Sequence, residues 1–171
     1  MRRLDIAIMA LFFLLAASCS ERTGSVTMLV GTYDSDNSGG IYSYAFNPRT
    51  GEAVPKGHTY LRDASFLTLN SDVDVVYAVS ERPDNTAALA AYSFDRDNLS
   101  FSPLSHSLTM GEDPCYVATN GKIVVTANYS GGSISVFRIG QSAEQSMSII
   151  STRLFGKTLS TAIRSCWTLR I

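Results

Sequence analysis

Three short apolar stretches recur along the chain, and each ends in small or polar residues. They are LVGTY (29–33), YAVSE (77–81) and VTANY (125–129). Each is followed by an alternating apolar stretch, namely IYSYAF (41–46), LAAYSF (89–94) and ISVF (134–137). Val30, Ala78 and Thr126 are spaced 48 residues apart, and Ile41 and Leu89 keep the same spacing. Short apolar or alternating runs bounded by turn residues predict β-strands, and their fixed spacing predicts a structural repeat.

Two further strands complete each repeat. The stretch DASFLTLN (63–70) precedes one apolar strand and aligns with DPCYVATN (113–120) at a spacing of 50. Turn-forming segments at 47–52 and 95–100 lead into polar strands near 54–60 and 101–110. Four antiparallel strands in about 48 residues are typical of a β-propeller blade. A plain β-sandwich with fortuitously similar hairpins is the competing interpretation, and no helical periodicity appears between Val26 and Ile139.

We therefore predict an all-β fold, a partial β-propeller of about three four-stranded antiparallel blades at residues 27–139. The pairs Gly39-Gly40 and Gly131-Gly132 are interpreted as hairpin turns, because no helix follows them to bind phosphate. From 140 to 171 the repeat stops and Ser, Thr and Arg dominate, with one further strand expected near Met147–Thr152. We interpret this tail as the end of a truncated or frame-shifted product. The alternative is a genuine small protein whose tail covers a sheet edge.

The first 19 residues form a separate signal segment, joined by a linker at 20–26. Arg2 and Arg3 precede an apolar run at 6–17, which is shorter than the roughly 20 residues that span a bilayer. LLAASC (14–19) resembles a bacterial lipobox, so Cys19 is predicted to carry a lipid anchor. We expect an exported protein, a periplasmic or outer-membrane lipoprotein of a bacterium. A plain signal peptide and a retained transmembrane helix are the alternatives.

Composition excludes some kinds of partner. The net charge is −1 and no basic run is present, so nucleic acid is not an expected partner. No His or Cys spacing predicts a metal site, and His58 and His106 lie in polar strands where we expect them to be solvated. Cys115 is expected to be a small buried thiol, although export also permits a disulfide with Cys166.

Three longer stretches resemble a known family. They are GTYDSDNSGGIYSYAFNPRTGE (31–52), SFLTLNSDVDVVYAVSE (65–81) and DPCYVATNGKIVVTANYSGGSISVF (113–137). All three resemble the seven-bladed lactonase family of the 6-phosphogluconolactonase type. The resemblance implies a propeller and, in active members, hydrolysis of a sugar lactone without a redox cofactor.

The resemblance also implies parts that this chain lacks. A seven-bladed member needs roughly 340 residues at this period. The family's His- and Arg-containing stretch has no match after Ile139, and Tyr116 stands where the family commonly has His. We therefore expect this chain by itself to be inactive. The alternative function is an exported, lipid-anchored binding or scaffold module without catalysis.

The repeat places three residue pairs at equivalent strand ends, where propellers usually bind ligands. They are Thr32–Tyr33, Ser80–Glu81 and Asn128–Tyr129. Glu81 is the candidate base, Asn128 could polarise a carbonyl, and Tyr33 and Tyr129 could stack on a sugar ring. The alternative is that these residues only cap strands and bond loop backbone. The expected ligand, in a complete relative, is a sugar lactone; no cofactor and no metal are expected, and a membrane only through Cys19.

Overall fold

The computed structural model describes residues 24–140 and 147–154, which form three antiparallel sheets. The first sheet contains β1 (Val26–Ser35), β2 (Ser38–Phe46) and β3 (Ala53–Thr59). The second contains β4 (Leu67–Leu69), β5 (Val75–Ser80), β6 (Ala88–Asp95) and β7 (Ser100–Leu108). The third contains β8 (Pro114–Thr119), β9 (Ile123–Asn128), β10 (Ser133–Ile139) and β11 (Met147–Leu154). The described residues contain no helix, and the prediction of an all-β partial propeller is confirmed.

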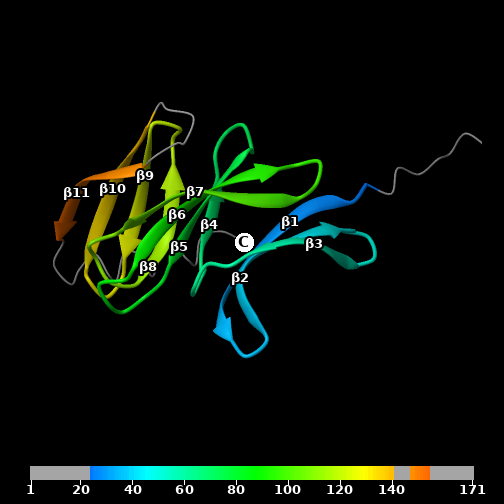
Figure 1. Ribbon diagram of the computed structural model, residues 1–171, viewed down its shortest axis with the longest axis horizontal. Helices are drawn as coiled ribbons and strands as arrows, with labels where there is room; N and C mark the ends of the chain where they lie inside the picture. The colour runs from blue at the N-terminus through cyan, green and yellow to red at the C-terminus, as the bar shows by residue number, and fades with distance from the viewer. Residues whose placement is uncertain (1–23, 141–146, 155–171) are drawn as a thin grey trace, which may run out of the picture.

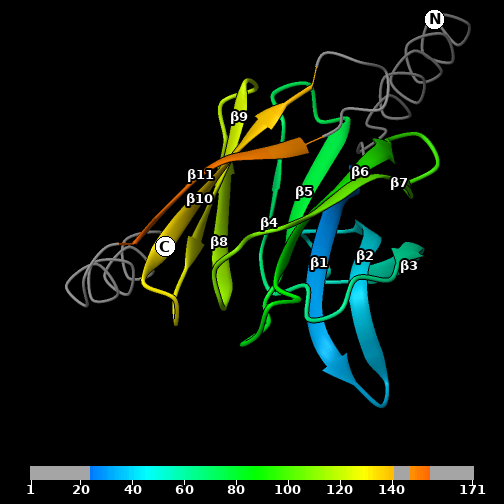
Figure 2. The same cartoon turned by 60° about the vertical axis from the view of Figure 1, so that its left-hand side comes forward.

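The three sheets stand side by side, and the chain passes from each sheet to the next (Figures 1 and 2). The innermost strands β4 and β8 lie next to each other, and the outermost strands β3, β7 and β11 follow one another in the same order. Such radial packing of neighbouring sheets is the propeller arrangement. In the described residues the second and third sheets have four strands, whereas the first has three, because no strand precedes β1 as β4 precedes β5.

The core lies between the sheets, and β5 explains why its sequence is continuously apolar. All six of its residues are buried, because one face packs on the first sheet and the other on the third. One core cluster, between the first and second sheets, contains Ile41, Val76 and Ala78. The other, between the second and third sheets, contains Tyr77 and Phe137. Burial of a large aliphatic or aromatic side chain contributes about 1.5–3 kcal/mol, so these interfaces are the main source of stability.

A β-bulge recurs at the same place in every repeat. The pairing of β2 with β3 shifts between Ser43 and Tyr44, and that of β6 with β7 shifts 48 residues later, between Ala91 and Tyr92. The pairing of β10 with β11 shifts between Val136 and Phe137, as the shorter loop of the third copy requires. Because bulges change strand twist locally, their recurrence shows that the three repeats share backbone geometry as well as strand order.

The two glycine pairs have different places. Gly131-Gly132 lies in the turn between β9 and β10, as predicted. The prediction for Gly39-Gly40 is wrong, because Asp36 and Asn37 form that turn and both glycines lie within β2. Gly40 has a φ of 101°, and a Cβ there would lie 2.2 Å from the carbonyl oxygen of Thr59. A glycine is therefore required by close backbone approach rather than by the turn.

The strand expected near Met147–Thr152 is confirmed as β11, which pairs with β10 and completes the third sheet. The blade thus continues into the segment that the sequence assigned to the tail. The predicted signal segment, Cys19 and the end of the tail lie outside the described residues. Within the described part of the chain, no helix has the length and apolar character needed to cross a membrane.

Candidate functional site

The connections at one end of the three sheets form the candidate site, which we call the mouth. They are the segments 33–38, 60–66, 81–87, 109–113 and 129–132. Two aspartates at equivalent repeat positions, Asp63 and Asp113, build this end of the molecule, and both have a φ of 50°. The Glu81 amide donates to the Asp63 carbonyl at 3.0 Å, and the Tyr129 amide donates to the Asp113 carbonyl at 2.8 Å. Each aspartate thus fixes the residue that follows the adjacent strand, β5 or β9.

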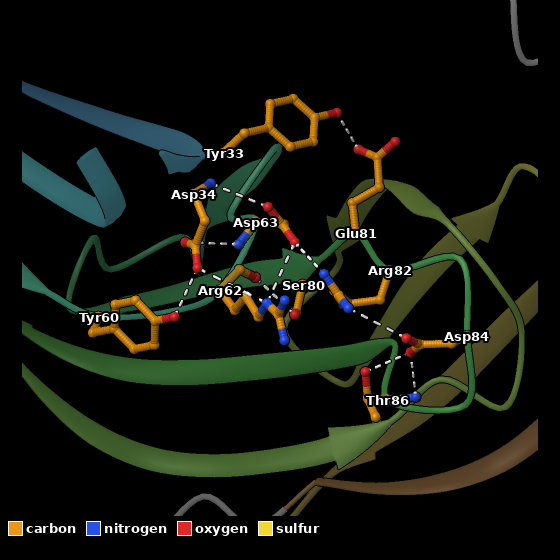
Figure 3. A network of polar contacts seen from close by, with 10 residues as sticks. All are labelled: Tyr33, Asp34, Tyr60, Arg62, Asp63, Ser80, Glu81, Arg82, Asp84 and Thr86. Atoms are coloured by element: carbon orange, nitrogen blue, oxygen red, sulfur yellow. Dashed lines mark hydrogen bonds and ion pairs between the residues drawn. The ribbon is translucent and has the colours of Figure 1, made fainter. Parts of the chain in front are cut away.

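Tyr33 and Glu81, two of the predicted site residues, are in direct contact across the first and second sheets. The Tyr33 hydroxyl donates to Glu81 Oε2 at 2.8 Å, and the two residues are 48 apart in the sequence (Figure 3). Burial around the phenol, then the bond to Glu81 and its negative charge, raise the pKa of Tyr33 to about 12. Tyr33 therefore stays a protonated donor at physiological pH and holds the carboxylate in one orientation.

Burial and the negative charge of Glu81 both affect the pKa of the Cys115 thiol. Burial raises the pKa of the Cys115 thiol, and the negative charge of Glu81 raises it further. The thiol points to the carbonyl of Ala127 at 3.7 Å and is a free cysteine of intermediate exposure. It is therefore a protonated, partly buried thiol, close to the role that the sequence predicted.

A second polar network links the loops of the first two sheets beside Tyr33 (Figure 3). The Asp34 amide donates to Asp63 Oδ1 at 3.1 Å, and the Tyr60 hydroxyl donates to Asp34 Oδ2 at 2.7 Å. Arg82 bridges Asp63 Oδ2 at 2.8 Å and Asp84 Oδ2 at 3.3 Å. Burial alone would raise the pKa of Asp63, but the bonds from Arg82 and from the Asp34 amide outweigh it and lower the pKa.

Sequence reasoning missed this network. Asp63 did carry a signal, because the sequence alignment placed it opposite Asp113 at the start of a repeat. Tyr60 and Arg82 carry none, since their partners Asp34 and Asp63 come from other segments and only the folded chain brings them together. Asp84 is bonded within its own loop, to Arg82 and Thr86.

Asn128, a predicted ligand residue, is instead fully buried at 0% exposure. Its Oδ1 accepts from Thr126 Oγ1 at 3.0 Å, and its Nδ2 donates to the hydroxyls of Ser133 at 3.0 Å and Ser135 at 2.8 Å. Gly111 packs so closely that a Cβ there would lie 2.4 Å from Nδ2. The amide therefore bonds the interior of the third sheet, and its position does not favour contact with a ligand.

Two aromatic side chains complete the description of this end. Tyr129 is partly buried in the turn after β9. Tyr116, on the inner strand β8, is 38% exposed and contacts the ring of Phe66 with centroids 4.8 Å apart. Aromatic surface therefore lies at the inner strand β8, at the position where the resemblance implied a His.

The histidines of the described segments lie elsewhere. His58 is on β3 and His106 on β7, the outermost strands of their sheets. His58 is exposed, as expected, but it also contacts the Gly39 carbonyl oxygen through Nε2 at 2.7 Å and packs on Tyr42. Within residues 24–140 and 147–154, no group of three or more His, Cys, Asp or Glu side chains could hold a metal ion.

Comparison with known proteins decides the family. The family model described as lactonase, 7-bladed β-propeller, matches residues 27–158. The chain belongs to this family. A 6-phosphogluconolactonase of Bacillus subtilis is 31% identical over 113 residues, which cover 64% of this chain and 32% of the relative. The resemblance read from the sequence is confirmed.

Solved structures agree. A 6-phosphogluconolactonase-type protein of Bacteroides fragilis is 44% identical with a TM-score of 0.74, covering 80% of this chain and 38% of that protein. One from Bacteroides uniformis is also 44% identical, with a TM-score of 0.71 and coverage of 76% and 38%. The periplasmic gluconolactonase of Pseudomonas aeruginosa, 24% identical with a TM-score of 0.66 over 74% of this chain and 38% of that one, shares the fold. The chain thus spans somewhat more than a third of these structures.

Proposed function

We propose that this chain forms part of the lactone-binding mouth of a sugar lactone hydrolase. Membership of the lactonase family supports the reaction class. The observation that carries the proposal is the Tyr33–Glu81 contact, which holds a carboxylate at the end of the sheets where propellers bind ligands.

In this proposal Glu81 is the general base. It accepts a proton from a water molecule as the water oxygen attacks the lactone carbonyl carbon. The ring C–O bond then breaks, the ring oxygen takes up a proton, and the product is the open hydroxy acid. A carboxylate can accept several hydrogen bonds, so the bond from Tyr33 to Oε2 does not prevent Glu81 from taking this proton.

We further propose that hydrolysis needs blades beyond these three sheets and that the chain alone is inactive. The developing oxyanion and the leaving oxygen need donors. The described histidines are on outer strands, and Arg82 is already paired with Asp63 and Asp84. The hypothesis of a truncated or frame-shifted product is tested on the genomic DNA: propeller sequence resuming in another frame supports it, and its absence there and in the neighbouring gene refutes it.

A chimera tests the catalytic proposal. Residues 27–154 of this chain replace the matching part of the Bacteroides fragilis protein, and hydrolysis of glucono-1,5-lactone is followed in a pH-stat. We expect an active chimera, loss of at least 100-fold in rate on Glu81→Gln, and no activity for the chain alone. Asp97→Asn, in the exposed turn at the other end of the second sheet, is the matched control. A fully active Glu81→Gln chimera would exclude Glu81 as the base.

The second candidate function is an exported, lipid-anchored binding or scaffold module. The observation that favours it is the signal segment ending at Cys19. Radiolabelled palmitate and membrane fractionation of the expressed chain test the anchor, with Cys19→Ala as the matched variant. Label and membrane association that both depend on Cys19 support the anchor, and an unlabelled protein in the soluble fraction refutes it.

A further inference from the structure

We infer that this mouth selects an uncharged sugar ring, and hence an unphosphorylated lactone in preference to a lactone carrying a phosphate. The inference rests on the proposed function and deepens it by naming the substrate class. Two independent features support it: a pair of exposed tyrosines held by carboxylates, and the charge balance of the mouth.

The tyrosine pair is built from Tyr33 and Tyr60, which are 56% and 63% exposed. Each hydroxyl is tied to a carboxylate, Tyr33 to Glu81 at 2.8 Å and Tyr60 to Asp34 at 2.7 Å. Figure 3 shows both rings beside Asp34, reached from different loops. Because its hydroxyl is already hydrogen-bonded, each ring loses little further side-chain entropy when a ligand binds. Its exposed apolar faces suit stacking on the C–H face of a sugar.

The carboxylates that fix these rings also make sugar hydroxyls suitable partners. Ionised Asp and Glu side chains only accept hydrogen bonds, and a sugar hydroxyl can donate one. A phosphate at physiological pH is an acceptor as well, so it gains nothing from Glu81 or Asp34 and is repelled by their charge.

The charge of the mouth opposes an anion more generally. Its segments and the adjoining residues carry seven acidic side chains against two basic ones: Asp34, Asp36, Asp63, Glu81, Asp84, Glu112 and Asp113 against Arg62 and Arg82. A surface with an excess of one sign of charge disfavours ligands of the same sign beyond any single contact.

The two arginines are already engaged. Arg82 has a side chain only 19% exposed and pairs with Asp63 and Asp84. Arg62 lies 3.9 Å from both Asp34 and Asp63. A phosphate that recruited Arg82 would have to separate its ion pairs, and would leave the partly buried Asp63 without its hydrogen-bonded counter-charge. The Arg62 side chain is 58% exposed and makes only these long contacts, so solvent screens its attraction for a phosphate.

Binding of two stable probes to the full chain tests the inference. The probes are D-glucose and D-glucose 6-phosphate, measured by saturation-transfer NMR and calorimetry at low and high salt. We expect the phosphate to bind at least tenfold more weakly at low salt, with the gap narrowing at high salt because screening weakens the repulsion. Tyr60→Ala should weaken both probes by a similar factor, while Tyr60→Phe, which keeps the ring, should weaken them less.

A charge reversal separates electrostatics from packing. Asp36→Lys, in the exposed β1–β2 turn, should strengthen phosphate binding several-fold and change glucose binding by a much smaller factor. Asp97→Lys, at the opposite end of the second sheet, is the matched control and should change neither. Equal or tighter binding of the phosphate by the unmodified chain overturns the inference while leaving the lactonase proposal intact. Binding of neither probe overturns the inference too, and the chimera's hydrolysis assay then judges the proposed function separately.

Discussion

The buried amide of Asn128 provides the sharpest test of how the strand ends are built. It was expected at the mouth, but its side chain has 0% exposure and bonds three hydroxyls, those of Thr126, Ser133 and Ser135. If these bonds hold the third sheet together, replacing Asn128 by Ala should destabilise the protein strongly. If Asn128 serves a ligand instead, the substitution should affect binding and leave stability nearly unchanged.

The magnitude follows from the groups left behind. Ser135 keeps a second bond, because its hydroxyl also donates to the Thr109 carbonyl. Thr126 and Ser133 lose the side-chain bond to Asn128, and a buried polar group without a partner costs about 1–3 kcal/mol. With the small cavity added, Asn128→Ala should lower the free energy of unfolding by about 3–5 kcal/mol, a large fraction of a domain's usual 5–15 kcal/mol.

Urea unfolding followed by circular dichroism measures this change. With a slope of about 1–3 kcal/mol per molar urea, the midpoint should fall by about 2 M. Asn37→Ala, in the exposed β1–β2 turn, is the matched control and should stay within about 0.5 kcal/mol of the parent. A double-mutant cycle of Asn128→Ala with Ser135→Ala should show a coupling of about 1–2 kcal/mol, since the two side chains are in contact at 2.8 Å. An Asn128→Ala protein as stable as the parent would refute the reasoning.

Three further outcomes are expected. Because the pKa of Asp63 is lowered in the folded state, its ion pair stabilises the fold above the unfolded-state pKa. This stabilisation is lost as pH falls through the lower folded-state pKa. In urea titrations, the difference in stability between the parent and Asp63→Asn should therefore shrink below about pH 4. The pKa of Tyr33, raised to about 12, means that its contribution to stability is complete below about pH 10 and lost as pH rises towards 12. The late part of the tyrosinate absorbance titration should lose one tyrosine in Tyr33→Phe, while the other tyrosines with raised pKa values, Tyr60, Tyr77 and Tyr92, still contribute to it. Gly40→Ala should cost more than about 2 kcal/mol in urea unfolding, since it combines a positive φ with a clash against Thr59, whereas Gly51→Ala, with nothing within 4 Å, should cost less.

The sheets could be predicted because the repeat is imposed by packing between sheets. Residues such as Ile41 and Leu89, 48 apart, both face the next sheet, so the same kind of side chain is needed at both positions. The recurring bulge obeys the same offset. A requirement repeated in every copy leaves a periodic signal, and a single sequence is enough to reveal it.

The missed features depend on backbone contacts that have no period. Gly40 is needed because the Thr59 carbonyl passes beside it, and composition alone made the pair resemble a turn. The network of Tyr60, Asp34 and Asp63 joins loops 26 and 29 residues apart, so no local pattern marks it. The prediction that Asn128 lies at a strand end is correct. Its side chain turns inward because Ser133 and Ser135, across the hairpin, accept its hydrogen bonds, and the sequence pattern does not show this.

Comparing the second and third sheets shows why the repeat predicts structure better than chemistry. In the second sheet the side chain of Asp63 accepts from Arg82, and in the third sheet the equivalent Asp113 accepts from the equivalent Ser130. Both aspartates have the same φ and hold the following strand end through the same backbone bond. The geometry therefore needs an acceptor at the aspartate position, whereas a guanidinium and a hydroxyl both suffice as its donor. Because donors of different charge fulfil one structural role, the charge of the mouth can change from blade to blade without changing the fold, and the ligand must be inferred from the side chains of this chain rather than from its architecture.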